Sequence, residues 1–230
     1  RRQRQMCIRD SKDSSANKTG VICSSFEIIA SLTLSTEEFL AIKDVYVQQV
    51  IEILRLKADQ EAKLLFKEYA LNAGRKTLVE LSMAISRQIN DVTDVILENL
   101  THNQDEVLAN PFYQELIYRH VPKILVERYK ERLLKRLPAP HQIAILSAYI
   151  ASYIVYREGL NWLDGVPVES RFEAARTYMA QDNFTSKLLS SVEASGLPDK
   201  DKIAAILRMS ATRDLTILEM EKSPDAKVAP

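Results

Sequence analysis

The stretch from Ser35 to Gly74, STEEFLAIKDVYVQQVIEILRLKADQEAKLLFKEYALNAG, decides the fold class of this 230-residue chain. It opens with a capping box, in which the side chains of Ser35 and Glu38 each accept a backbone N–H at the start of a helix. Apolar residues then recur at helical spacing, at Leu40, Val47, Val50, Leu54, Ala58, Ala62, Leu65 and Tyr69. The pattern predicts one long amphipathic helix that bridges two packed regions and ends at Asn72-Ala73-Gly74.

Most of the remaining chain carries the same period. Further helices are predicted over residues 77–100, 123–137, 141–158, 169–180, 183–193, 199–209 and 211–222. The segment from His141 to Glu158 is apolar nearly all round, which is typical of a helix that others surround. The fold class is therefore predicted to be mainly α.

One short segment departs from this pattern. Gly20-Val21-Ile22-Cys23 is an apolar run after a glycine, and it predicts a single buried strand, with a short helix over residues 25–32 after it. Asn17 precedes this strand and Ser24 follows it. Side chains at the C-terminal end of a strand in an open α/β sheet are placed to contact a ligand. The alternative is that Ser24 or Ser25 only caps the next helix.

Composition argues against several classes of function. Lysine plus arginine and aspartate plus glutamate number 31 each, so no charge excess favours nucleic acid or an anionic membrane as a partner. Neither of the phosphate-loop patterns GxGxxG and GxxxxGK(S/T) occurs, which argues against a whole dinucleotide-binding domain. The longest uncharged run, Gln142 to Tyr156, is too short to span a membrane. Two cysteines, Cys7 and Cys23, indicate a reducing compartment.

Residue types that carry catalysis are not gathered in any recognisable motif. The three histidines do not occur at a metal-ligand spacing, and we expect structural roles for His102, His120 and His141. No nucleophile elbow is visible. Three tyrosines recur near helical spacing and are expected in the core, at Tyr149, Tyr153 and Tyr156. We therefore predict no catalytic residue and no metal ligand in this chain.

Five residues in and around the predicted strand follow the pattern Asn-x-x-Gly-Val-x-x-Ser-x-x-Glu, at Asn17, Gly20, Val21, Ser24 and Glu27. The same pattern ends the nucleotide-binding domain of glutamate dehydrogenases, although Thr19 stands here in place of the first glycine of their Gly-Gly pair. Two later blocks, Leu64 to Tyr69 and Ala151 to Gly159, follow in the same order. Over residues 10–163 the chain resembles the C-terminal region of the large NAD-specific glutamate dehydrogenases.

The resemblance implies an architecture and two contact residues. Residues 11–34 would form the end of a Rossmann-type NAD-binding domain, with its last strand, and residues 35–222 a C-terminal helical domain. Residues 1–10 are expected to be an artefact or a truncated end, and residues 223–230 a tail. By the resemblance, Asn17 would bind the nicotinamide carboxamide of NAD. Ser24 would bind the side-chain carboxylate of glutamate.

The resemblance also implies a function for the whole protein. The parent would oxidatively deaminate L-glutamate to 2-oxoglutarate and ammonia, with NAD as hydride acceptor, in the mitochondrial matrix or the cytoplasm. The helices would pack on the upstream nucleotide-binding domain and help to build a homo-oligomer. Because the family's catalytic residues lie upstream, the isolated chain is expected to be inactive. The competing hypothesis is a helical interaction or oligomerisation domain without an enzymatic parent.

Overall fold

The computed structural model describes residues 18–163, 166–209 and 211–222. Helices make up 87% of the described residues, and no strand occurs among them, which confirms the mainly α fold class. The chain divides into two compact units, one ending at Trp162 and the other beginning at Leu163. None of the helices in the described ranges combines the length and the apolar composition that a membrane crossing requires.

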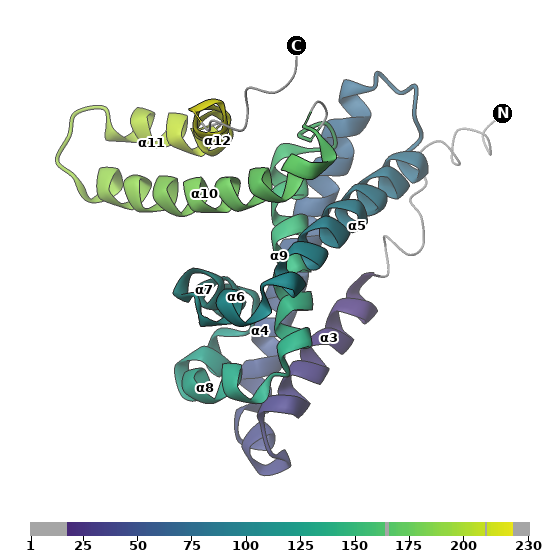
Figure 1. The fold of residues 1–230 in the computed structure, drawn as a ribbon, viewed down its shortest axis with the longest axis vertical. Coiled ribbons are helices and arrows are strands. Elements are labelled where there is room, and N and C mark those ends of the chain that lie inside the picture. The colour runs from purple at the N-terminus through teal and green to yellow at the C-terminus, as the bar shows by residue number, and fades with distance from the viewer. Residues whose placement is uncertain (1–17, 164–165, 210, 223–230) are drawn as a thin grey trace. The chain divides into compact units, whose positions relative to one another are not determined.

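The first unit is a bundle around one apolar helix. Its elements are α3 (Lys18–Thr33), α4 (Thr36–Leu71), α5 (Leu78–His102), α6 (Gln104–Ala109), α7 (Pro111–His120), α8 (Lys123–Arg136) and α9 (Ala139–Glu158). Helix α9 contacts α4, α5, α6 and α7, and it runs through the middle of the unit (Figure 1). Its small residues Ser147 and Ala151 are fully buried, which permits the close packing of α5 along it. The prediction of a surrounded helix at residues 141–158 is confirmed.

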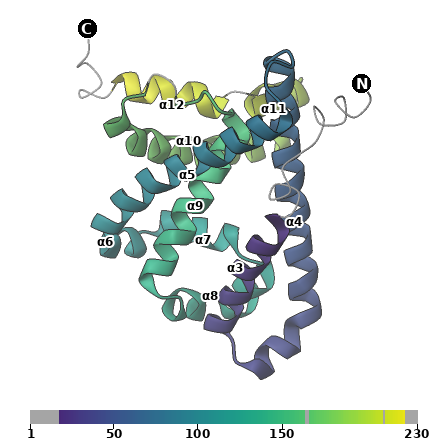
Figure 2. The same ribbon diagram turned by 90° about the vertical axis from the view of Figure 1, so that its right-hand side faces the viewer.

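Helix α4 begins as the capping box predicts. The backbone N–H of Glu38 donates to the Ser35 hydroxyl over 3.2 Å, and the Ser35 N–H donates to the Glu38 carboxylate over 2.8 Å. The first half of α4 packs against α3 and α8 through Tyr46 and Val50. Its second half packs against α5 and α9, so that α4 joins two packed regions of the unit (Figure 2).

The exposed face of α4 differs from the prediction. Leu40 and Val47 are 61% and 42% exposed, whereas Ile42 and Tyr46 are buried. The reason is that α4 carries apolar residues on more than one face. Periodicity finds these residues, but only the neighbouring helices α3 and α8 decide which of them are covered.

The predicted strand at Gly20–Cys23 is wrong, because these residues lie in α3. A short apolar run does not distinguish a strand from part of a buried helix. Here the apolar spacing continues through Ile22, Phe26 and Ile29, and the last two are each 1% exposed. That three- and four-residue spacing places the three side chains on one side of the helix, where Phe26 and Ile29 are buried and Ile22 is half-buried against the cluster with α4 and α8.

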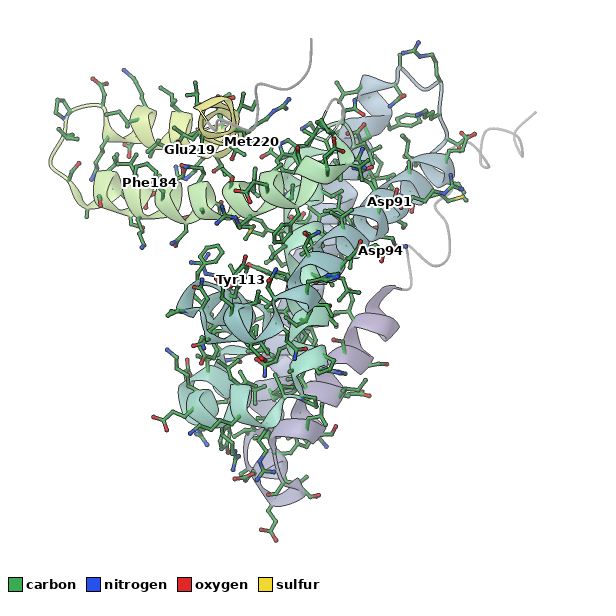
Figure 3. The ribbon with its side chains drawn as sticks, in the orientation of Figure 1. Asp91, Asp94, Tyr113, Phe184, Glu219 and Met220 are labelled. Atoms are coloured by element: carbon green, nitrogen blue, oxygen red, sulfur yellow. The ribbon has the colours of Figure 1, made fainter. Side chains whose placement is uncertain are left out.

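Helix α5 is amphipathic along its whole length. Leu81, Ile85 and Ile96 are buried, while Asp91 and Asp94 lie on its outer side (Figure 3). A second capping box, formed by Thr77 and Glu80, starts this helix.

The second unit contains η1 (Val168–Ser170), α10 (Arg171–Ala194), α11 (Lys200–Met209) and α12 (Ala211–Lys222). Helices α11 and α12 both pack on α10, which buries Tyr178 and Met179. The two helices predicted over residues 169–180 and 183–193 are one continuous helix in the structure. The intervening Gln181 and Asp182 are compatible with a helix interior, because neither residue breaks helical backbone geometry.

Candidate functional site

The residues of the Asn-x-x-Gly-Val-x-x-Ser-x-x-Glu pattern that the structure describes share α3. Gly20, Ser24 and Glu27 are spaced by four and then three residues, so these positions lie along one face of the helix. The side chains of Ser24 and Glu27 are exposed. Asn17, the predicted nicotinamide contact, lies outside the described residues.

The structure corrects the predicted positions of the two serines. Neither Ser24 nor Ser25 follows a strand, and neither caps a helix, because both are interior residues of α3. Consecutive residues of a helix point about 100° apart. Ser24 is accordingly exposed, whereas Ser25 is half-buried. The candidate contact face is thus a helix surface rather than the end of a sheet.

The opposite face of α3 fixes this helix to the bundle. Phe26 and Ile29 belong to a buried cluster with residues of α4 and α8, among them Tyr46 and Leu125. The Tyr46 hydroxyl donates to the backbone carbonyl of Phe26 over 2.7 Å. Burial, together with the nearby Cys23 and Glu27, raises the pKa of Tyr46, so its hydroxyl keeps its proton and remains a donor at neutral pH.

A groove runs between α3 and the first half of α4. It has a volume of about 560 Å³. Glu27 and Ser31 line it from α3, and Lys43, Val47 and Ile51 from α4. Glu27 therefore belongs both to the motif face and to the wall of the groove. The groove itself is mainly apolar, with one acidic and one basic side chain among its lining residues.

The chemistry available on this face is limited. A serine hydroxyl can donate a charge-assisted hydrogen bond to a carboxylate. Glu27, three residues from Ser24 on the same face, repels a second carboxylate. Burial raises the pKa of the neighbouring Cys23 thiol, and Glu27 raises it further, so this thiol is a poor nucleophile at neutral pH. The described part of the face thus presents a hydroxyl donor and a carboxylate, Ser24 and Glu27, with which to orient a ligand.

His120 and His102 each contact neighbouring groups of the bundle. His120, the last residue of α7, stacks on Phe26 with ring centroids 5.5 Å apart and meets the edge of Tyr149 at 5.9 Å. Burial and the nearby Lys57 ammonium lower its pKa to about 3, so its ring is neutral at physiological pH. His102 interacts through Nδ1 with the Glu98 carbonyl over 2.7 Å. Within the described ranges, no group of three or more His, Cys, Asp or Glu side chains could hold a metal ion.

Sequence reasoning missed the residues that fix α3. Tyr46 and Phe26 are twenty positions apart, and no sequence motif links a hydroxyl to a backbone carbonyl over that separation. The one available signal was the apolar spacing of Ile22, Phe26 and Ile29, which indicates a helix with a buried face.

The chain is similar to four curated glutamate dehydrogenases. It is 31% identical over 162 residues to glutamate dehydrogenase 2 of Dictyostelium discoideum, which covers 65% of this chain and 15% of that protein. It is 31% identical over 159 residues to a probable NAD-specific glutamate dehydrogenase of Schizosaccharomyces pombe, which covers 64% and 14%. The NAD-specific glutamate dehydrogenase of Saccharomyces cerevisiae is 28% identical over 163 residues. The predicted resemblance to NAD-specific glutamate dehydrogenases is confirmed.

The aligned part spans about 15% of the length of these relatives. The chain therefore corresponds to a small part of much larger proteins. No family model matches it, and no solved structure matches it.

Proposed function

We propose that this chain is part of an NAD-dependent glutamate dehydrogenase, and that the exposed face of α3 contributes to its glutamate site. The observation that carries the proposal is the placement of Ser24 on an exposed helix face, in line with Gly20 and Glu27 of the motif. The similarity to NAD-specific glutamate dehydrogenases supports the same reaction class.

In the proposed reaction, NAD would accept a hydride from L-glutamate, the amino group would lose a proton, and water would hydrolyse the resulting imine to 2-oxoglutarate and ammonia. Ser24 donates its hydroxyl hydrogen to the side-chain carboxylate of glutamate. Asn17 binds the nicotinamide carboxamide of the cofactor. We propose that the groups for bond making and proton transfer come from the rest of the protein, so the isolated chain should be inactive.

Electrostatics supports an incomplete site. A bound glutamate side chain brings a carboxylate near Glu27, and one neutral hydroxyl does not offset that repulsion. Cationic side chains must therefore reach the α3 face from outside the described residues or across the groove. A contribution from an upstream nucleotide-binding domain of the same protein meets this requirement.

A second candidate function, helix-mediated interaction or oligomerisation, has its own observation. The second unit exposes large apolar side chains on α10 and α11, with Phe184 at 55%, Ile206 at 67% and Met209 at 83% exposure. Contiguous exposed apolar surfaces mark interaction sites, and exposed large side chains of this kind are the observation that favours this function. The two functions are compatible in one homo-oligomeric enzyme, but only the first predicts a kinetic role for Ser24.

The test is steady-state kinetics of the full-length protein. Replacing Ser24 by alanine removes a charge-assisted hydrogen bond, so kcat/KM for glutamate should fall by roughly ten- to a hundredfold. The KM for NAD should stay unchanged, because Asn17 makes the cofactor contact. Ser25→Ala is the matched control, since it deletes the same atom about 100° around the same helix. Thermal melts of both variants check folding.

Two results would contradict the proposal. If Ser25→Ala weakens glutamate binding and Ser24→Ala leaves the kinetics unchanged, the motif assigns the substrate contact to the wrong serine. Normal kinetics in both variants would exclude α3 as a substrate contact and would favour the interaction domain.

A further inference from the structure

Phe26 of α3 makes specific contacts with two neighbouring helices, α7 and α4. The ring of Phe26, which is 1% exposed, stacks on His120 at the end of α7, with an angle of 29° between the ring planes. The carbonyl oxygen of the same residue accepts the hydrogen bond from Tyr46 of α4. One contact fixes the side chain of Phe26 and the other fixes its backbone.

Two contacts of this kind restrict how α3 turns about its own axis. A backbone carbonyl points along the helix, whereas the aromatic ring projects sideways from it. A rotation of α3 would displace the Phe26 ring from the His120 ring. A shift along the axis would lengthen the hydrogen bond to the Tyr46 hydroxyl. The setting of α3 in the bundle therefore depends on both neighbours.

Ser24 lies two residues before Phe26 on the same rigid helix. Two residues correspond to a turn of about 200° and a rise of about 3 Å, so the two side chains point to nearly opposite sides of α3. Any change in the rotation of the helix at Phe26 moves the Ser24 hydroxyl on the exposed side. A displacement of about 1 Å at a substrate-positioning group can cost on the order of a hundredfold in rate.

We propose that Tyr46 and His120 are positioning residues for the glutamate contact of Ser24, acting through Phe26. The inference rests on the proposed function of Ser24 and extends it to two residues on other helices, α4 and α7. His120 supplies a flat ring for stacking, and Tyr46 supplies the hydrogen bond that sets the height and rotation of the helix.

The chain offers a matched control for Tyr46. Tyr156 of α9 also has its hydroxyl bonded between helices, in this case to the Glu61 carboxylate of α4 over 3.3 Å. Burial is the largest cause of a raised pKa for both tyrosines, so both hydroxyls are protonated donors. Tyrosine-to-phenylalanine changes at these two positions delete the same atom, but only Tyr46 contacts the helix that carries Ser24.

The experiment compares Tyr46→Phe and Tyr156→Phe in the full-length protein. Tyr46→Phe should raise the KM for glutamate about three- to tenfold, which corresponds to one net hydrogen bond, and should leave the KM for NAD unchanged. Tyr156→Phe should leave both KM values unchanged, and it should lower the Tm about as much as Tyr46→Phe does. If both variants lose stability alike and neither shifts the KM for glutamate, Tyr46 is merely structural and the inference is wrong.

The double variant Ser24→Ala/Tyr46→Phe separates this inference from the proposed function. If Tyr46 acts through Ser24, the double variant should have the same kcat/KM as Ser24→Ala alone. Additive losses would overturn the inference and leave the role of Ser24 intact. A silent Ser24→Ala would overturn the proposed function, and the positioning role would fall with it.

Variants at His120 test the other contact and remain informative if Tyr46→Phe folds poorly. His120→Leu removes the ring that stacks on Phe26 and should raise the KM for glutamate severalfold. His120→Phe keeps an uncharged aromatic ring at this position. It should keep the KM for glutamate within about twofold of that of the unmodified protein. An equal KM for the leucine and phenylalanine variants would contradict the role of the stacking contact.

Discussion

Gly159 ends α9 in a backbone conformation that other residues avoid. Its φ is 92° and its ψ is −169°, a region populated almost entirely by glycine. A Cβ atom at this position would lie 2.9 Å from the Oε1 atom of Glu68, a buried carboxylate that accepts the Leu160 N–H. Backbone strain and a steric clash therefore act together at one residue.

The change Gly159→Ala should destabilise the first unit by about 1–3 kcal/mol because of the backbone strain alone. Displacement of the Glu68 carboxylate adds to this cost. Urea denaturation followed by circular dichroism measures the difference. Gly196→Ala is the control, since a Cβ there meets no atom within 4 Å, and it should change stability by less than about 1 kcal/mol. Equal effects of the two variants would contradict the strain at Gly159.

At the scale of single helices, the two capping boxes differ in their contact with another helix. Glu38 and Glu80 both occupy the third position of their helix, and both carboxylates accept the backbone N–H of the capping residue. Glu38 also accepts from Arg132 of α8 over 2.8 Å, which joins the start of α4 to another helix. The Arg132 hydrogen bond, followed by the Ser35 N–H, lowers the pKa of Glu38 from 4.5 to about 2.

This difference predicts a pH-dependent stability. Because the pKa of Glu38 is lower in the folded state, its ionised form stabilises the protein above about pH 4.5. The contribution is lost as the pH falls from 4.5 towards 2. Glu38→Gln keeps a side chain that can complete the capping box but removes the charge. It should lower the Tm at pH 7, and its difference from the unmodified chain should shrink as the pH approaches 2.

Glu80→Gln is the matched control for Glu38→Gln. It makes the same change in a capping box whose carboxylate has its pKa lowered by bonds to Thr77 rather than by an arginine. Its Tm at pH 7 should fall less than that of Glu38→Gln. If the two variants lose the same stability at pH 7, the Arg132 contact contributes nothing and the capping boxes alone explain the pKa values.

The helices show which signals can be read from the sequence. The Ser35 capping box and the apolar spacing of the 141–158 segment are local, and both predicted elements formed where expected. The segment Gly20–Cys23 is too short for its apolar spacing to distinguish a strand from a helix. In the structure it belongs to α3, which packs against α4 and α8. The exposure of Leu40 and Val47 depends on which neighbours cover α4, which is tertiary information.

The candidate site follows the same rule. The spacing of Gly20, Ser24 and Glu27 was visible as a motif, and its meaning as one face of a helix needed the structure. The contacts of Phe26 with Tyr46 and His120 connect three helices, and no spacing along the chain encodes them. Sequence thus identified residues on the exposed face, but not those that hold the helix in place.

At the scale of the whole molecule, the chain consists of two compact units. The first unit, up to Trp162, contains α9 with its buried Ile150 and Ile154 and the helices around it. The second unit has its own small core around Tyr178 and Met179 of α10. A unit that holds its own core can fold by itself.

We therefore expect a chain that ends at Trp162 to fold alone. It keeps all of α3 to α9, so it should show a helical far-UV spectrum and one cooperative thermal transition. A chain that ends at Ser147 is the control, because it lacks the second half of α9, including Ile150, Ile154 and Val155, which are at most 3% exposed. Loss of these three side chains removes several kilocalories per mole of apolar burial, at about 1.5–3 kcal/mol for each, so this shorter chain should not unfold cooperatively. The contrary result would be a chain ending at Trp162 that also melts without a cooperative transition and binds a hydrophobic dye. In that case the first unit depends on residues after Trp162, and the two units do not fold independently.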